Sequence, residues 1–243
     1  MTTLAAWTEL KLLAREPLTV IVSLLFPVLM MILLVGSFGN QPDPDFGGVG
    51  GTDFYVPVYT AATIAVLGLL GLPTHLAAYR QSGVLQRLRA FGLPPVALMG
   101  AQAAVMVALV VVGVAVMLAI GFGAYDLTAP QSTLGVMVAL AAGTAAFAGL
   151  GLALGTLMPT ARAAQGLGLA LFFGLFFIAG GGPPPAILPE SINTFVDWTP
   201  MGPLVTAVSD PWHGHGSNAA ALAALLAIAL LGAAIAQRRL SRL

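Results

Sequence analysis

The sequence predicts an all-α polytopic membrane protein with six transmembrane helices, and three observations carry this prediction. Only 7% of the 243 residues are charged and 58% are hydrophobic, whereas a soluble domain carries about 25% charged residues. The apolar residues form six stretches close to the length of about 20 residues that a helix needs to cross a bilayer. The cations and the acids alternate between the segments that separate these stretches.

The six expected spans cover residues 18–38, 55–78, 96–122, 134–158, 163–182 and 219–236. Three glycines and three prolines at 180–185 break the fifth span early, and the sixth is short but rich in alanine and leucine. We interpret residues 1–243 as a single transmembrane domain.

The charges predict how the chain is oriented. All nine Lys and Arg residues fall in the N-terminus, the second loop, the fourth loop and the C-terminus, whereas seven of the nine acids fall in the other three loops. Because Lys and Arg accumulate in cytoplasmic loops, both termini are expected to be cytoplasmic. The richness in alanine and glycine further suggests a bacterial inner membrane.

The segment before the first span has the pattern of an interfacial helix. At helical spacing, Trp7, Leu10 and Leu13 share one arc, and Lys11 and Arg15 lie on the other. A Trp-bearing amphipathic helix beside a span lies along the headgroup layer. The alternative is an ordinary solvated N-terminus.

The second loop, "YRQSGVLQRLRAFGLPP" at 79–95, holds three of the nine cations. A helix over 82–91 places its apolar residues on one arc of roughly 120°, and Gly92 and Pro94 end it. This arc needs a cover, either the bilayer surface or a groove on a cytoplasmic partner. Its members are Val84, Leu85, Leu88 and Phe91.

The longest connection, 183–217, precedes the last span on the opposite side of the membrane. Residues 192–196 and 203–208 are too short to cross a bilayer, and they are expected to form short helices that dip into the outer leaflet. Irregular backbone at that depth needs protein or water around it.

The order of these parts resembles the ABC-2 family of ABC transporter permeases, and the resemblance covers essentially the whole chain. Members are six-span half-transporters with an N-terminal elbow helix, a coupling helix between spans two and three, and an outer re-entrant helical pair before span six. The matching stretches are "WTELKLLAREPLTVIVSLLFPVLM", "RQSGVLQRLRAFGLPP" and "LPESINTFVDWTPMGPLVTAV".

Many members carry a Glu-Arg-x-x-Gly-Thr-Leu-Glu-Arg-Leu-like string in the coupling segment, followed by a proline. This chain differs from it at Tyr79, Gln81 and Gln86, where acids are common, so its coupling segment is purely basic. The resemblance implies that the segment contacts an ATPase through Arg80, Gly83, Val84, Leu85, Arg87, Leu88, Arg89 and Phe91.

The sequence places nucleotide chemistry on another polypeptide. It has no Gly-x-x-x-x-Gly-Lys-Ser/Thr loop, and its only lysine is Lys11. ATP and Mg²⁺ are therefore expected on a partner ATPase, and this chain is expected to bind no cofactor and to be no enzyme. The other expected partners are a second permease copy or a homologous permease and the lipid bilayer, with no nucleic acid.

Two further patterns leave alternatives open. Gly151 and Gly155 in the fourth span allow close helix packing, either inside the chain or at a dimer seam; in the family, spans one and five commonly form the dimer contact. The phenylalanines of "FFGLFF" form either the wall of an apolar cavity or a lipid-facing surface. They are Phe172, Phe173, Phe176 and Phe177.

The ionisable residues disfavour the remaining classes of function. Among Asp, Glu, His, Lys and Arg, His75 is the only residue in the six spans, and the lack of a buried Asp or Glu weighs against proton coupling. The "WHGH" motif at 212–215 with Asp210 falls short of a metal-ligand set, so we interpret it as an outer loop with an aromatic interface anchor.

These patterns together favour the permease subunit of an ATP-driven exporter for a drug, a lipid or a lipid-linked glycan. The alternatives are a proton-coupled carrier and a non-transporting membrane scaffold or enzyme.

Overall fold

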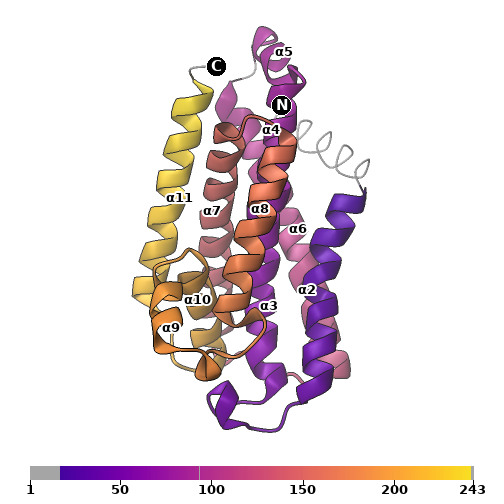
Figure 1. The fold of residues 1–243 in the computed structure, drawn as a ribbon, viewed down its shortest axis with the longest axis vertical. Helices are drawn as coiled ribbons and strands as arrows, with labels where there is room; N and C mark the ends of the chain where they lie inside the picture. The colour runs from indigo at the N-terminus through magenta and orange to yellow at the C-terminus, as the bar shows by residue number, and fades with distance from the viewer. Residues whose placement is uncertain (1–16, 93, 242–243) are drawn as a thin grey trace.

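Long helices running side by side make up the protein in this computed structural model (Figure 1). The structure describes residues 17–92 and 94–241. The expected elbow helix, with Trp7, Leu10, Lys11, Leu13 and Arg15, lies outside the described residues.

The helices follow one another in the order of the predicted spans. Two π-helical turns, Leu67–Gly71 and Phe177–Gly181, continue α3 and α8, and short 3-10 turns lie at Pro44–Phe46 and Pro185–Ile187. The α-helices are α2 (Pro17–Phe38), α3 (Gly51–Val66), α4 (Leu72–Gln81), α5 (Val84–Ala90), α6 (Pro95–Ala124), α7 (Thr133–Leu157), α8 (Ala161–Phe176), α9 (Glu190–Asp197), α10 (Met201–His213) and α11 (Ala219–Leu240).

The prediction of an all-α membrane protein is confirmed. Five helical stretches among the described residues are long and apolar enough to cross a membrane: Gly51–Gln81, Ala97–Ala124, Thr133–Leu157, Ala161–Gly181 and Ala219–Leu240. Helix α2, which holds the predicted first span, has 22 residues. Only its part Leu25–Phe38 is identified as apolar helix, and this part is too short to be included among the five. A total of six spans therefore stays a prediction.

The helices extend furthest beyond the predicted spans at the second and sixth of them. The second begins at Gly51 rather than at residue 55, because Asp53 lies in the first helical turn, where the helix dipole favours an acid. The sixth continues to Leu240 rather than 236, with Arg238 and Arg239 in its last turn, where the dipole favours cations.

Three of the long helices begin where the sequence supplies a capping side chain. Ser132, Thr160 and Asn218 accept hydrogen bonds from backbone N–H groups three residues ahead, at the starts of α7, α8 and α11. A capping side chain of this kind pairs a donor that the helix leaves free. Helix α6 begins instead with Pro95 in its first turn, where the missing N–H costs nothing.

The second span is the centre of the bundle. Of the residues in an apolar 18-residue window of this span, 94% are buried inside the protein, whereas the corresponding share for Ala219–Leu240 is 22%. Helix α7 packs beside it and also against α11, where Gly149 and Gly232 bring the two backbones together. Such close approach of small residues is typical of helices that pack in a membrane.

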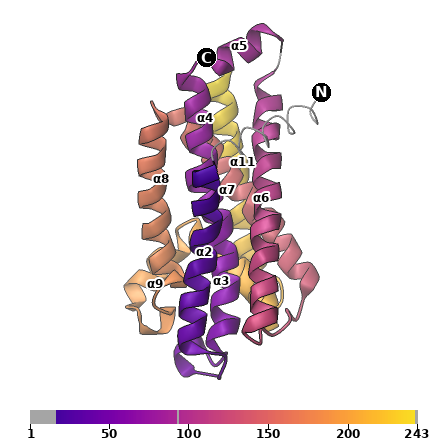
Figure 2. The same ribbon diagram turned by 90° about the vertical axis from the view of Figure 1, so that its right-hand side faces the viewer.

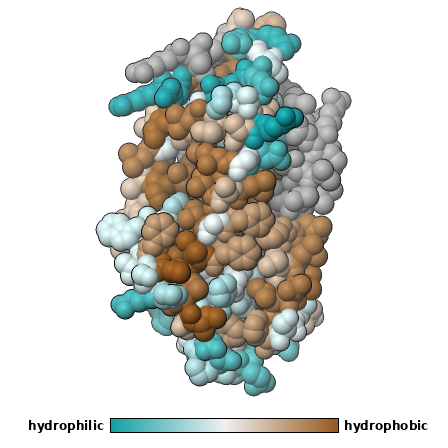
Figure 3. All heavy atoms as spheres, in the orientation of Figure 1, coloured by the Kyte–Doolittle hydropathy of each residue, from teal (hydrophilic) through white to brown (hydrophobic). Residues whose placement is uncertain are grey.

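The two ends of the bundle differ in what they carry. Helix α5 and the C-terminus lie at one end, whereas α9 and α10 lie toward the other (Figures 1 and 2). On the face shown in Figure 3, a broad hydrophobic belt separates hydrophilic ends. The second-loop segment 79–95 and the connection 183–217 are thus placed on opposite sides of the apolar belt.

Candidate functional site

Helix α5 is a short turn of helix between two glycines in the left-handed region. Gly83 has φ +69° and Gly92 has φ +79°, a conformation that residues with a side chain rarely adopt. These glycines let the chain leave α4, make one short helix and return toward α6. The segment Gly83–Gly92 thus projects from the end of the bundle.

The apolar arc predicted for this segment is divided between two surroundings. Leu85 is only 4% exposed and packs against the core of its own chain, whereas Phe91 is 85% exposed. Val84 is half-buried. The side chains of Leu88 and Arg89 are outside the described part of the structure. Among the described side chains of the arc, Phe91 is therefore the one that needs an external cover.

The arginines of the segment also have different roles. Nη1 of Arg80 donates hydrogen bonds to the carbonyl oxygens of Gly155 and Met158, at 3.0 and 2.9 Å. Arg87 is exposed and donates to the nearby Ser82 carbonyl at 3.2 Å. Since a helix ends in unpaired carbonyls with partial negative charge, Arg80 closes the C-terminus of α7 and ties it to α4.

Replacing Arg80 with glutamine is expected to lower the free energy of unfolding by about 2–3 kcal/mol, because charge-assisted bonds to partly buried carbonyls are lost. The matched control is Arg87→Gln, whose exposed, local bond is expected to contribute less than about 0.5 kcal/mol. Thermal unfolding in detergent measures both. Equal melting temperatures for the two variants would contradict this role of Arg80.

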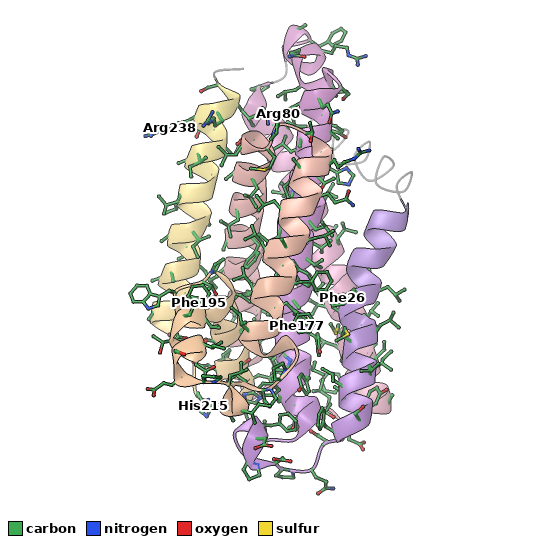
Figure 4. All side chains as sticks on the ribbon, in the orientation of Figure 1. Phe26, Arg80, Phe177, Phe195, His215 and Arg238 are labelled. Atoms are coloured by element: carbon green, nitrogen blue, oxygen red, sulfur yellow. The ribbon has the colours of Figure 1, made fainter. Side chains whose placement is uncertain are left out.

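Phenylalanine rings fill the space between α2 and α8. The ring of Phe26 lies 5.7, 5.1 and 5.6 Å, centroid to centroid, from Phe172, Phe173 and Phe176. Phe172 and Phe176 are fully buried, whereas Phe177 is partly exposed; Figure 4 shows Phe26 and Phe177 between the two helices. This ring cluster closes the space, and its role in lining a path stays a prediction.

Helix α8 ends in an unwound π segment that two tyrosines hold. Ala179 and Gly180 leave helical geometry, with Gly180 at φ +92°. The hydroxyls of Tyr59 and Tyr55 donate to the carbonyls of Gly181 and Gly182, at 2.7 and 2.8 Å. A helix can break at membrane depth only where other groups pair the freed backbone, and these tyrosines do so.

A Tyr59→Phe substitution is expected to lower the free energy of unfolding by about 1–2 kcal/mol, because the buried Gly181 carbonyl loses its donor. Tyr125→Phe serves as the control, since the Tyr125 hydroxyl lies 3.5 Å from the Ile32 carbonyl at an exposed position. Thermal unfolding of the two purified variants measures the difference in their stability. A Tyr59→Phe protein as stable as the control would show that the bond contributes nothing.

The two candidate glycines of the fourth span are used inside the chain. A Cβ at Gly151 would collide with the carbonyl oxygen of Gly68, and one at Gly155 would lie 2.8 Å from Cβ of Leu76. Both are buried. Of the two alternatives, intramolecular packing is therefore the one that the geometry supports.

A hydrogen-bond network at the end of the bundle opposite α5 was missed in the sequence. The carboxylate of Asp53 accepts from the backbone N–H and the hydroxyl of Thr128, both at 2.8 Å, and Nε2 of His213 lies 3.1 Å from the Asp53 carbonyl. Trp212 donates to the Thr128 carbonyl at 3.2 Å. The network joins α3, the 125–132 connection and α10, and the only hint of it in the sequence is an acid beside an apolar run.

The interpretation of Trp212 as an interface anchor was wrong. It is 3% exposed, because α10 packs it against the bundle. The exposed aromatic residues of the outer segment are instead Phe195 and Trp198 on and after α9. Among the described residues, no three His, Cys, Asp or Glu side chains gather closely enough to hold a metal.

The short outer helices expected in this connection are present as α9 and α10, although α10 is longer than the predicted 203–208. With a projecting basic turn at one end and paired short helices at the other, the arrangement fits the family expected from the sequence. The family model described as ABC-2 type transporter matches residues 2–210. No curated protein shows a significant match to the chain.

Proposed function

This chain belongs to the ABC-2 type transporter family, and on that premise we propose that it is the membrane permease of an ATP-driven exporter, powered by separate ATPase subunits. A second permease copy or a homologous permease would complete the transporter. The cargo class that fits best is lipophilic or amphipathic, such as a drug, a lipid or a lipid-linked glycan. The distribution of Lys and Arg favours cytoplasmic termini, and the richness in alanine and glycine favours a bacterial inner membrane.

The exposure of Phe91 is the observation that carries this proposal. A large ring that is 85% exposed on a basic turn beyond the apolar belt is costly in water and needs a cover. A groove on a cytoplasmic ATPase supplies that cover. Arg87, one helical turn before Phe91, is exposed and, among the residues that the structure describes, bonded only to the Ser82 carbonyl, so its remaining N–H groups can reach acidic groups of the same partner.

The turn that carries Phe91 is connected directly to the centre of the bundle, so a movement of the turn would be transmitted to the spans. Helix α5 follows α4 through Gly83, and α4 continues without a break into the buried second span. Arg80 fastens the same end to α7. When ATP binding closes the ATPases, a push on α5 would therefore move the central span and α7 together and open a path for cargo.

The buried polar side chains favour apolar cargo over proton coupling. Among the described residues they are threonine and tyrosine hydroxyls and the amide of Gln102, none of which titrates near neutral pH. A proton-driven carrier uses buried carboxylates or histidines. In the six predicted spans His75 is the one such residue, and it is only half-buried.

Transport into everted membrane vesicles tests the proposal. Vesicles that contain the permease and its ATPase are expected to accumulate a fluorescent lipophilic dye or a labelled lipid when ATP is added. Vanadate should stop the accumulation and a protonophore should not. Uptake that the protonophore abolishes and vanadate leaves intact would favour the proton-coupled carrier instead.

A further inference from the structure

An open cavity of about 480 Å³, with several polar side chains in its lining, lies where α4 ends and α8 begins. It is at the same end of the bundle as Arg80 and α5 (Figure 4), yet it is separate from the exposed face of Phe91. Its lining comes from both helices and the turn before α8, and consists of Thr74, Gln81, Thr160, Ala161, Arg162 and Gln165.

The lining offers hydrogen-bond donors and a positive charge. Oε1 of Gln81 accepts from the Ala161 N–H at 3.2 Å, which leaves its NH₂ group to donate. The Thr160 oxygen accepts from the Ala163 N–H at 3.1 Å, which leaves its hydrogen to donate. Thr74 already donates to the Leu70 carbonyl. No carboxylate is part of the lining, so the cavity is suited to an anion.

The guanidinium of Arg162 has no partner within the described part of the chain. It is exposed, and the described carboxylates form no ion pair with it. Arg80, by contrast, donates hydrogen bonds from its Nη1 to two carbonyl oxygens. An unpaired guanidinium beside amide and hydroxyl donors matches the geometry of a phosphate, which arginine binds through two parallel hydrogen bonds.

The surface next to the cavity indicates that the phosphate belongs to a lipid. Along α8, Leu169 is an exposed hydrophobic residue. It lies seven residues beyond Arg162, which places it on the same face of the helix and about 10 Å further along, within one leaflet of a hydrocarbon core of about 30 Å. A lipid with an acyl chain along Leu169 would hold its headgroup at the cavity.

We propose that this α4–α8 cavity binds the phosphate of an anionic phospholipid. In the orientation proposed above, the lipid belongs to the cytoplasmic leaflet. Arg162 binds the phosphate, and the amides of Gln81 and Gln165 donate to its oxygens. The bound lipid bridges the end of α4 to the start of α8, so it steadies the segment that leads into α5. The site needs the proposed orientation but neither an ATPase nor a cargo.

Lipid binding to the purified full-length chain tests the site without any transport assay. Native mass spectrometry and thermal unfolding are compared after addition of phosphatidylglycerol, phosphatidylcholine or inorganic phosphate. Phosphatidylglycerol is expected to bind and to raise the melting temperature, and the other two are not. If inorganic phosphate stabilises the protein as much as phosphatidylglycerol does, the claim that the bound phosphate belongs to a lipid is overturned.

Variants assign the effect to the cavity. Arg162→Gln is expected to weaken phosphatidylglycerol binding at least tenfold. Gln165→Glu, which places a carboxylate of equal size in the lining, should do the same. Arg238→Gln is the control, because it removes an exposed cation at the same end of the bundle (Figure 4). Unchanged binding in both cavity variants, or an equal loss in the control, would overturn the proposal.

Discussion

Leucine in place of Gly168 is expected to abolish the folded protein, whereas leucine in place of Gly166 on the same helix is expected to be tolerated. A Cβ at Gly168 would collide with the carbonyl oxygen of Leu69 and lie 3.1 and 3.2 Å from Leu69 C and Leu70 Cα. These are backbone atoms of the central span and cannot rotate away. At Gly166, nothing lies within 4 Å of the added atom.

The collision is severe because Gly168 faces a π turn. A π turn is wider than an α turn, and in Leu67–Gly71 it brings backbone close to both neighbouring helices. Gly151 of α7 meets the Gly68 carbonyl, and Gly68 itself approaches Phe147. We call Gly68, Gly151 and Gly168 the glycine contact. It lets α7 and α8 both touch the widened turn, and no side chain fits between them.

Overpacking of a well-packed site costs about 1–3 kcal/mol or more, and a clash with fixed backbone belongs at the upper end or beyond. Detergent size-exclusion profiles and melting temperatures of Gly168→Leu and Gly166→Leu measure the difference. Both changes add the same side chain to α8, so helix propensity cancels between them. A monodisperse Gly168→Leu protein as stable as Gly166→Leu would contradict the glycine contact.

Truncation of Phe91 to alanine is expected to weaken binding of the ATPase at least about 30-fold. An aromatic anchor in an interface contributes about 2 kcal/mol or more, which corresponds to this factor. Folding should be unaffected, because the ring makes little contact with its own chain at 85% exposure. Leu85 is unsuitable for this test, since it is buried and its loss would disturb the fold.

Trp198→Ala provides the matched control for Phe91. Trp198 is also an aromatic residue at 85% exposure, but it follows α9 at the opposite end of the bundle (Figure 1). Affinity of the ATPase for each variant, measured in detergent by biolayer interferometry, should fall for Phe91→Ala alone. Full affinity of Phe91→Ala would place the ATPase contact elsewhere on the basic end.

Hydropathy and charge were sufficient to predict the membrane class and the approximate place of each helix, because both depend on local composition. The break at 180–185 was visible for the same reason. The hydrogen-bond partners of individual charged residues were not predictable. Arg80 looked like part of a basic surface, but its partners are 75 and 78 residues further along the chain, and no local pattern reports them.

The details of packing were hidden for a related reason. A π turn has the same hydropathy as the α-helix around it, so Leu67–Gly71 gave no signal. The Asp53 network joins residues 75 and 160 positions apart. Trp212 was misassigned because an aromatic residue near an outer loop fits both an interface anchor and a buried donor, and only the packing of α10 distinguishes them.

The most direct test of the central claim is to purify the wild-type chain from its own membrane in mild detergent and to measure ATP hydrolysis in the eluate. We expect an ATPase to co-purify in equal molar amount, with hydrolysis that vanadate inhibits. A folded and abundant permease that elutes without any vanadate-sensitive hydrolysis, at several detergent concentrations, would contradict the claim that ATP drives this protein.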